Sequence, residues 1–336
     1  MIMNLSFNIA GHAWTVPKAV QSIQIEQEMG WPEGWSIRYS GVRKRHWVDH
    51  PESNGELGAK AALQALKAAK MTLKEVDLII FAGATYDYPL PNQSSIIKSK
   101  LDNSNTVNIA CIDVDTTCLS FITALEIAID KMSMGRAETI LLVSSEVASN
   151  GLDAENRETY TLFGDAAAAF VLTKGNNITL MNSMLKTYSA GAHDTIIEGG
   201  GNKMPPKMYD FDARTHSFRM NGKRLLRLAK RELPIFMTEF FGAIGINPKK
   251  IEHCIPHQAS KSGLIIFESC FPLKKYGVNV VSTLEDYGNC IAASIPMTLS
   301  MHLEKNQIID GERCLLVGTS AGFGIGAALL QFNKIT

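Results

Sequence analysis

A loose internal duplication is the feature that most constrains the fold of this chain. Apolar, strand-like runs, each ending in a short polar turn and followed by a helical pattern, occur twice in the same order. The paired runs are residues 76–83 with 251–257, 107–114 with 278–283, 139–144 with 313–318, and 163–172 with 322–330. Two such series in one chain indicate two related α/β units.

The character of these runs predicts how the two units are built. They are almost continuously apolar, which is typical of strands in sheets covered on both faces. The pattern is interrupted between residues 175 and 201, by Asn176-Asn177 and by three glycines at 199–201. We therefore expect two halves, residues 1–175 and 176–336, packed against each other. Ligand sites in such sheets usually lie beyond the carboxyl ends of the strands.

Composition excludes several classes of partner. The 336 residues are 46% hydrophobic, enough for a large core, and carry 33 basic and 33 acidic side chains. No net basic charge attracts nucleic acid or an anionic membrane. No apolar run reaches the roughly 18 residues of a membrane helix, and the first ten residues read as a strand rather than as a secretion signal.

The cysteines and the absence of metal-type motifs point to a cofactor-free protein of a reducing compartment. The six cysteines are scattered without a CxxC pair, so we expect free thiols and a cytoplasmic location. We expect no metal, since no metal-ligand cluster stands out. The glycine-rich stretch 322–326 lacks the following helix and acidic residue of a dinucleotide site.

Cys118 has the local context of a nucleophile. It follows a strand-like run and precedes a helical pattern of apolar residues at Phe121, Leu125, Ala128, Ile129 and Met132. Thr116 and Thr117 are suitable N-cap residues, so we expect Cys118 in the first turn of this helix. The helix dipole then lowers the pKa of the thiol below its ordinary value of about 8.5. The alternative is a small buried core residue, the reading we assign to the other five cysteines.

Two further polar residues follow predicted strands in the second half. His257 lies in Ile255-Pro256-His257-Gln258, where the proline ends the strand and the imidazole can face a cleft. Asn289 follows Gly288 at a tight turn before a buried helical pattern. Each residue alone is more often structural. Their positions at strand ends predict that both can converge on Cys118 where the halves meet.

These motifs together resemble the β-ketoacyl-acyl-carrier-protein synthase III family of the thiolase superfamily. The resemblance covers nearly the whole chain. It rests on Trp35 with 41–46, the cysteine motif 115–121, the segment 163–167, Pro256-His257-Gln258-Ala259, Gly288-Asn289 with 292–296, and the glycine-rich end 322–326. It implies a thiolase-like, five-layered αβαβα fold of two duplicated halves and a homodimer.

The resemblance also implies a two-step reaction. Cys118 takes an acyl group from acyl-CoA or an acyl carrier protein, and a malonyl unit on carrier protein then loses carbon dioxide and attacks the acyl-cysteine. The loss of carbon dioxide leaves a thioester enolate, whose oxygen needs two hydrogen-bond donors. His257, neutral at this step, and the amide of Asn289 supply them. The backbone N–H groups of Cys118 and Gly322 form a second oxyanion hole for acyl transfer.

Substrate contacts are likewise carried over from the family. Trp35 and Arg157 match residues that hold the adenine of CoA, a reasonable pairing of an aromatic ring with a guanidinium. Gly222, Ala259 and Phe121 are assigned to the substrate channel. Leu90 stands where a large aromatic residue often bounds the acyl pocket, so a smaller side chain there admits a longer or branched primer.

A basic amphipathic helix is expected after Asn221. Its cationic side chains, together with one after the histidine motif, are the expected docking surface for an acidic carrier protein: Lys223, Arg224, Arg227, Lys230, Arg231 and Lys261. The alternative is a solvated helix face.

Departures from the family pattern suggest a specialised paralogue. Ser260-Lys261 follows Gln258-Ala259 where the family has asparagine and a nearby arginine, and Tyr39 occupies the slot of a second arginine near Trp35. The leading interpretation is a decarboxylating condensing enzyme of fatty-acid or polyketide-like synthesis. Two alternatives remain: a relative that joins acyl chains head to head or transfers acyl groups, and a non-catalytic subunit of a heterodimeric synthase.

Overall fold

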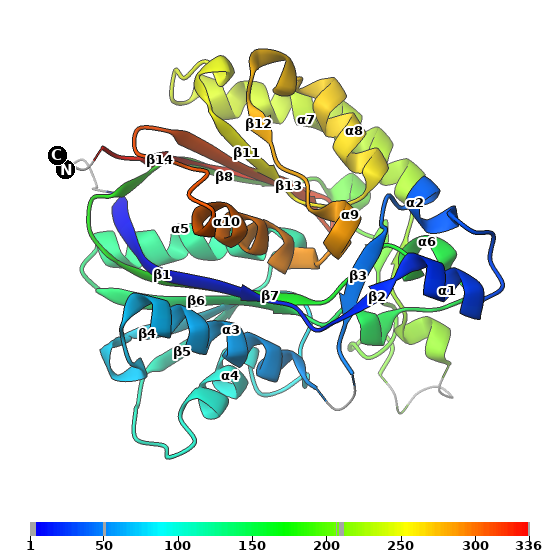
Figure 1. Cartoon of the computed structure of the whole chain (residues 1–336), viewed down its shortest axis with the longest axis horizontal. Helices are drawn as coiled ribbons and strands as arrows, with labels where there is room; N and C mark the ends of the chain where they lie inside the picture. Colours follow the sequence, from blue (N-terminus) through cyan, green and yellow to red (C-terminus); the bar gives the residue numbers. More distant parts are fainter. Residues whose placement is uncertain (1–4, 50–51, 206, 208–211, 335–336) are drawn as a thin grey trace.

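A mixed β-sheet organises the whole molecule. The computed structural model describes residues 5–49, 52–205, 207 and 212–334. Within them, ten strands form one sheet in the order β12-β11-β13-β14-β8-β1-β7-β6-β4-β5 (Figure 1). Their bounds are β1 (Ser6–Thr15), β4 (Leu78–Ala82), β5 (Ala110–Val114), β6 (Thr139–Glu146), β7 (Ala166–Lys174), β8 (Ile178–Thr187), β11 (His253–Pro256), β12 (Asn279–Val280), β13 (Arg313–Ser320) and β14 (Gly324–Phe332).

The sheet divides into two equivalent halves. In the first, β4 pairs parallel with β5 and β6, and β7 pairs antiparallel with β6 and β1. In the second, β11 pairs parallel with β12 and β13, and β14 pairs antiparallel with β13 and β8. A short antiparallel contact between β1 and β8 joins the halves. Every pair of runs matched in the sequence therefore occupies equivalent strands of the two halves.

The remaining short strands lie outside this sheet. They are β2 (Lys18–Gln21) and β3 (Lys44–Trp47), which pair with each other, and β9 (Thr195–Ile196) and β10 (Arg219–Met220), which form a second small pair. The helices are α1 (Ser22–Glu28), α2 (Trp35–Tyr39), α3 (Asn54–Ala69), α4 (Gln93–Leu101), α5 (Ser120–Ser133), α6 (Arg157–Tyr160), α7 (Gly222–Gly242), α8 (Lys261–Cys270), α9 (Leu284–Tyr287) and α10 (Ser294–Glu304).

The helices form three layers around the two half-sheets, as Figure 1 shows. Helices α3 and α4 cover the outer face of the first half, and α7 and α8 cover the outer face of the second. Between them, α5 and α10 contact strands of both halves. The apolar positions expected on the helix after Cys118 are all buried in α5, where they join the central core. The structure therefore has the predicted five layers, α/β/α/β/α.

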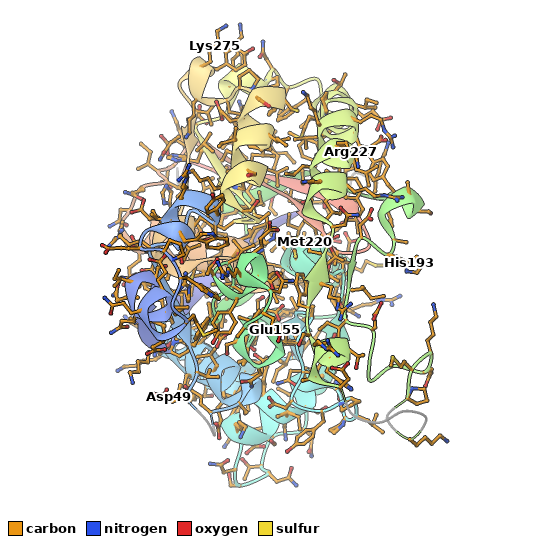
Figure 2. All side chains as sticks on the ribbon, turned by 90° about the vertical axis from the view of Figure 1, so that its right-hand side faces the viewer. Asp49, Glu155, His193, Met220, Arg227 and Lys275 are labelled. Atoms are coloured by element: carbon orange, nitrogen blue, oxygen red, sulfur yellow. The ribbon has the colours of Figure 1, made fainter. Side chains whose placement is uncertain are left out.

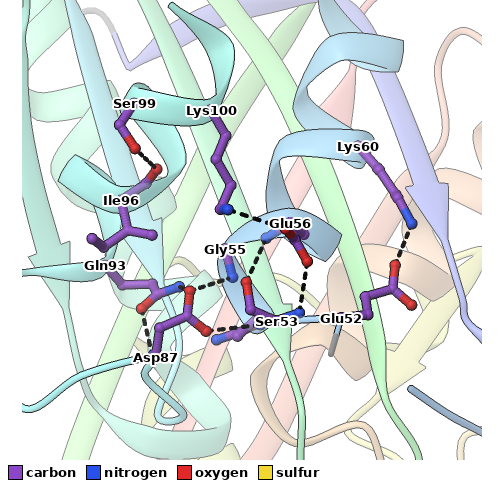
Figure 3. A network of polar contacts seen from close by, with 11 residues as sticks. Glu52, Ser53, Gly55, Glu56, Lys60, Asp87, Gln93, Ile96, Ser99 and Lys100 are labelled. Atoms are coloured by element: carbon purple, nitrogen blue, oxygen red, sulfur yellow. Dashed lines mark hydrogen bonds and ion pairs between the residues drawn. The ribbon is translucent and has the colours of Figure 1, made fainter. Parts of the chain in front are cut away.

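A polar network fixes the loop after β4, which borders the functional site. Asp87 accepts hydrogen bonds from the backbone N–H groups of Asn54 and Gly55, at 2.9 and 3.0 Å, at the start of α3 (Figure 3). Gln93 accepts from the N–H of Asp87 at 2.9 Å. A capping box between Ser53 and Glu56 completes this helix start. The loop thus has a fixed position between α3 and α4.

Two of the predictions concern membrane-spanning helices and the boundary between the two halves. Among the described residues, no helix is long and apolar enough to cross a bilayer. The boundary between residues 175 and 176 remains a prediction; it lies in the turn between β7 and β8.

Candidate active site

A cavity of about 400 Å³ brings the three predicted catalytic residues together. Cys118, His257 and Asn289 all line it, although they lie far apart in the sequence. The carboxyl ends of β5 and its equivalent β12 precede Cys118 and Asn289, and β11 leads into His257. The pseudo-symmetry of the two halves is therefore what assembles the site, as expected for sheets of this kind.

Cys118 lies in a single 3₁₀ turn, η2 (Thr117–Leu119), directly before α5. The expected capping by Thr116 and Thr117 is wrong, because neither side chain caps the helical turn. Thr117 instead has a left-handed backbone, with φ of 52°, and its N–H donates to the Asp115 carboxylate at 2.8 Å. This strained connection holds the cysteine at the cavity wall.

The pKa of the Cys118 thiol is opposite to the prediction. Burial, and then the neighbouring Glu146 carboxylate, raise the pKa of Cys118 to about 12, although hydrogen bonds from the backbone N–H groups of Ala321 and Cys118 itself act to lower it. The helix start does not lower the pKa of the thiol, because desolvation by burial has the larger effect at this site. The free enzyme therefore holds Cys118 as a neutral thiol at neutral pH.

The same backbone donors correct the oxyanion-hole assignment. The N–H of Ala321, rather than that of Gly322, contacts the thiol together with the N–H of Cys118. Ala321 lines the cavity, whereas Gly322 is not among the residues that line it. Thr117 Oγ1 donates to the Ala321 carbonyl at 3.3 Å, which ties the glycine-rich turn to the cysteine loop. We therefore assign the second donor to Ala321.

His257 is held rigidly at the end of β11. Its backbone N–H donates to the Val317 carbonyl at 2.8 Å, and its side chain is 4% exposed. Burial lowers the pKa of His257 to about 4, so the ring is neutral near pH 7, as the enolate-donor role requires. Its Nδ1 is buried without a hydrogen-bond partner in the described part of the chain.

The orientation of Asn289 is fixed by two hydrogen bonds. Its Oδ1 accepts from the N–H of Ile291 at 2.9 Å, and its Nδ2 donates to the Ala259 carbonyl at 3.1 Å. Because an amide nitrogen carries two protons, one N–H remains for a ligand. Gly288 before it has φ of 70°, and a Cβ there would lie 2.5 Å from the Leu162 carbonyl oxygen. Only glycine fits this turn.

Two buried polar residues that sequence reasoning missed hold this arrangement. Gln258 accepts from the N–H groups of Thr283 and Leu284 at 3.0 and 3.1 Å and donates to the Pro256 carbonyl at 2.7 Å, so it joins the histidine loop to α9. Glu146 ends β6, accepts from the N–H of Ala84 and the Thr85 hydroxyl, and is fully buried. The sequence signal that could have identified Glu146 is a single glutamate at the end of an otherwise apolar strand.

The predicted substrate residues fall into two groups. Gly222 and Ala259 line the cavity, whereas Trp35, Arg157, Leu90 and Phe121 are not among its lining residues. Trp35 packs against Tyr39, with ring centroids 4.8 Å apart, and Arg157 lies over Trp31, 5.1 Å from the ring centroid. Leu90 is 85% exposed, and Phe121 is buried against Phe170 in the core.

The predicted docking cations are exposed along α7 and at the start of α8. They are Lys223, Arg224, Arg227, Lys230, Arg231 and Lys261. Arg224 pairs with Asp194 at 2.9 Å and Arg231 with Glu232 at 2.6 Å. Figure 2 shows Arg227 on the outside of α7, on the same side of the molecule as Met220, a cavity-lining residue. The cations thus lie near the cavity.

A thiol faced by paired backbone donors, beside a neutral imidazole and an oriented amide, equips the cavity for two oxyanions. One set of donors suits the tetrahedral intermediate of acyl transfer, and the other suits a thioester enolate. Within the described residues, no group of three or more histidine, cysteine or acidic side chains is placed to hold a metal ion. The fold and site therefore define a thiolase-like, acyl-transferring condensing enzyme.

Comparison with known proteins identifies the branch. The family model for 3-oxoacyl-[acyl-carrier-protein] synthase III matches residues 112–189, and its C-terminal model matches residues 242–332. The chain belongs to this family. It is 31% identical to the β-ketoacyl-[acyl-carrier-protein] synthase III of Neisseria gonorrhoeae (strain NCCP11945), over 93% of this chain and 95% of the relative.

Two further relatives extend the agreement along the chain. The β-ketoacyl-[acyl-carrier-protein] synthase III of Clostridioides difficile (strain 630) is 27% identical over 98% of this chain and its own whole length. The crystal structure of the 3-oxoacyl-[acyl-carrier-protein] synthase III of Aquifex aeolicus VF5 superposes with a TM-score of 0.83 at 25% identity, covering 97% of this chain and 100% of that one. The predicted family and fold class are thus confirmed.

Proposed function

We propose that this enzyme loads an acyl group onto Cys118 and extends it by decarboxylative condensation with malonyl-carrier protein. The acyl donor is acyl-CoA or an acyl carrier protein, and neither a metal nor another cofactor takes part. The observation that carries the proposal is the single cavity in which Cys118, His257 and Asn289 meet. Since all three groups are present, a non-catalytic subunit is not favoured, and no specific observation favours head-to-head condensation.

The first step is acyl transfer. The Cys118 sulfur attacks the thioester carbon, the carbon–sulfur bond to CoA breaks, and the thiol proton leaves with the departing thiol. The N–H groups of Cys118 and Ala321 stabilise the tetrahedral oxyanion. Because burial keeps Cys118 protonated in the free enzyme, proton removal accompanies the attack.

The second step is condensation. The malonyl thioester loses carbon dioxide, and the electron pair of the broken bond forms an enolate whose oxygen accepts from His257 Nε2–H and Asn289 Nδ2–H. The enolate carbon attacks the acyl-cysteine carbonyl, the bond to the Cys118 sulfur breaks, and the departing thiolate takes up a proton from water to restore the thiol. A neutral His257 suits this step, because its Nε2–H donates a hydrogen bond to the enolate oxygen without first taking up a proton from solvent.

Intact-mass spectrometry tests the first step. We expect an acyl adduct on the wild-type chain after incubation with acyl-CoA, and none on a folded Cys118→Ala variant. No adduct with any acyl-CoA or acyl-carrier-protein donor would refute the proposal. An adduct that never turns over with malonyl-carrier protein would refute the condensation step alone.

A Cys118→Gln variant isolates the second step. Its side-chain amide mimics an acylated cysteine, so we expect decarboxylation of malonyl-carrier protein without condensation. The double variants with His257→Ala or Asn289→Asp are the matched comparisons, and each should lower the rate roughly 10²–10³-fold. Equal rates in the single and double variants would remove both residues from the enolate site.

A homodimer is part of the proposal. Strand β5 is at the edge of the sheet, and Asn92, at the end of the neighbouring loop, donates to the Cys111 carbonyl on it at 3.4 Å. That loop exposes Tyr88 (57%) and Leu90 (85%), and an open edge beside exposed apolar side chains favours pairing with a second copy. Sedimentation of the wild type and of Leu90→Arg tests this; a wild-type monomer would contradict it.

We propose acyl-CoA as one source of the primer acyl group, because aromatic side chains and an arginine lie close together near the expected adenine site. Trp35 and Arg157 lie in the aromatic cluster with Trp31 and Tyr39, which supports contact with the adenine of CoA. Trp35→Ala should raise the KM for acetyl-CoA and not that for an acetyl-carrier protein.

The free thiols support the cytoplasm as the place of action.

A further inference from the structure

The active-site cavity continues well beyond the catalytic groups, along one face of α7. The helix contributes residues at spacings of three and four: Gly222, Leu225, Leu226, Ala229 and Leu233. These positions lie on the same side of the helix. From Gly222 to Leu233 the lining spans about 16 Å at the helical rise of 1.5 Å per residue. The cavity is therefore elongated rather than a pocket around the thiol.

The other walls come from α8 and from the outer face of the second half-sheet. Helix α8 lies beside α7 in Figure 1 and contributes Ile266 and Phe267. Val317 on β13 belongs to the same apolar cluster as Leu233 and Phe267. Leu233 is 3% and Phe267 8% exposed, so this end is closed. We name this extension the apolar arm, lined by Leu225, Leu226, Ala229, Leu233, Ile266, Phe267 and Val317.

The chemistry of the apolar arm restricts its occupant. None of its seven side chains carries a hydrogen-bonding group. The polar hydroxyl side chains of the lining lie outside the arm: Thr85, Thr117, Ser260, Thr319 and Ser320 belong to the segments around the reacting groups, and Thr195 belongs to β9. The amides of a pantetheine would lose their hydrogen bonds with water in the arm, whereas a hydrocarbon chain would lose none. An apolar recess with polar groups at one end is typical of a site for an acyl chain.

We propose that the apolar arm binds the linear acyl chain of a thioester substrate, and that this enzyme therefore prefers medium to long acyl groups over acetyl. The inference rests on the proposed acyl transfer to Cys118. The arm opens into the cavity that holds the thiol, so a chain in it has its carbonyl end near the nucleophile. Each further buried methylene strengthens binding about fourfold until the closed end is reached.

Acylation rates at Cys118 measure this preference directly. Acetyl-, octanoyl-, dodecanoyl- and hexadecanoyl-CoA are compared by intact mass, and the readout is the ratio of rate constants between donors. We expect a dodecanoyl-to-acetyl ratio well above one for the wild type. Ala229→Phe fills the middle of the arm and should lower this ratio at least tenfold. Leu233→Ala lengthens the arm and should raise the hexadecanoyl-to-dodecanoyl ratio.

The matched control is Ile235→Phe, on the same helix. Ile235 is 56% exposed and does not line the cavity, so its ratios should equal those of the wild type. Opposite shifts from the filling and lengthening variants identify a chain site, because general loss of stability would not change selectivity in both directions. A wild-type preference for acetyl, or unchanged ratios in both arm variants, would overturn the proposal.

The failure of the arm and the failure of acyl transfer are distinguishable. If no donor acylates Cys118, acyl transfer is refuted, and the arm is then tested by calorimetric binding of dodecanoate to the wild type and to Ala229→Phe. Binding that weakens at least tenfold in Ala229→Phe supports the arm. No binding, or equal binding, overturns it.

Discussion

The backbone of Gly318 on β13 lies so close to the side chain of His257 that no residue with a side chain fits at position 318. A Cβ placed on Gly318 would lie 2.6 Å from the Cβ of His257, closer than two such atoms approach in proteins. His257 cannot move aside freely, because its N–H is bonded to the neighbouring Val317 carbonyl. The imidazole position is therefore set by the absence of a side chain on the adjacent strand.

Gly318→Ala should displace His257 and reduce decarboxylation of malonyl-carrier protein by roughly 10²-fold, the lower range for loss of an oxyanion donor. Acylation of Cys118 should fall much less, since its donors are backbone groups. The two steps are measured separately, by release of carbon dioxide and by intact mass. Gly242→Ala, at an open position at the end of α7, is the control. Equal losses in both steps would contradict a specific effect on His257.

Much of the fold was predictable because the same order of apolar runs and helical patterns occurs twice in the chain. The matched apolar runs occupy equivalent strands, since burial on both faces requires apolar residues in each copy. Cys118, His257 and Asn289 were predictable as strand-end residues of this pattern. Their convergence follows from the pairing order of strands, which sequence distance alone does not reveal.

The electrostatics of the site were not predictable from local sequence. The pKa of Cys118 depends on burial and on Glu146, a residue of β6 that only the fold brings close. The choice of Ala321 over Gly322 depends on which N–H the turn points at the sulfur. Likewise, Arg157 lies over Trp31, although the motif-based expectation paired it with Trp35. Each of these outcomes is a tertiary contact rather than a local preference.

The buried His257 should make the protein less stable as the pH falls. The pKa of His257 is lowered to about 4 by burial, against about 6.5 in an unfolded chain, so below pH 6.5 the unfolded chain takes up the proton first. The contribution of the neutral His257 ring to the free energy of unfolding is complete above pH 6.5 and is lost as the pH falls toward 4. Between pH 7 and pH 5 the wild type should lose about 2 kcal/mol more unfolding free energy than His257→Gln.

Urea unfolding at the two pH values measures this difference. Substitution of the exposed His193 by glutamine is the control for the loss of a histidine outside the site. A His257→Gln variant that loses as much stability as the wild type would show that the folded protein accommodates the charged ring.

Glu146 should control the reactivity of Cys118 only at alkaline pH. Burial raises the pKa of Glu146 to about 8, so the carboxyl is mostly protonated near pH 7 and becomes charged as the pH rises above 8. Its charge then opposes ionisation of Cys118. Glu146→Gln removes that charge, and alkylation of Cys118 by iodoacetamide at pH 9 should become roughly tenfold faster.

Peptide mapping assigns the alkylation to Cys118 rather than to the half-buried Cys111 or Cys270. At pH 6.5 the variant and the wild type should react at the same rate, because the carboxyl is then neutral. A rate increase of equal size at both pH values would indicate a looser site instead of a removed charge.

Arg227 and Lys230 on α7 should contribute to carrier-protein recognition through charge. Both are exposed near the cavity and, within the described residues, have no ion-pair partner, unlike Arg224 and Arg231. Arg227→Glu with Lys230→Glu should raise the KM for malonyl-carrier protein roughly tenfold, mainly by slowing association, and flatten its salt dependence. The turnover number should stay the same, since neither side chain lines the cavity. Lys275→Glu combined with Lys274→Glu makes the same change in net charge at two exposed positions, with Lys275 away from Arg227 in Figure 2, and is the control. If the control double variant raises the KM as much as the α7 double variant, the effect is one of net charge and the docking surface lies elsewhere.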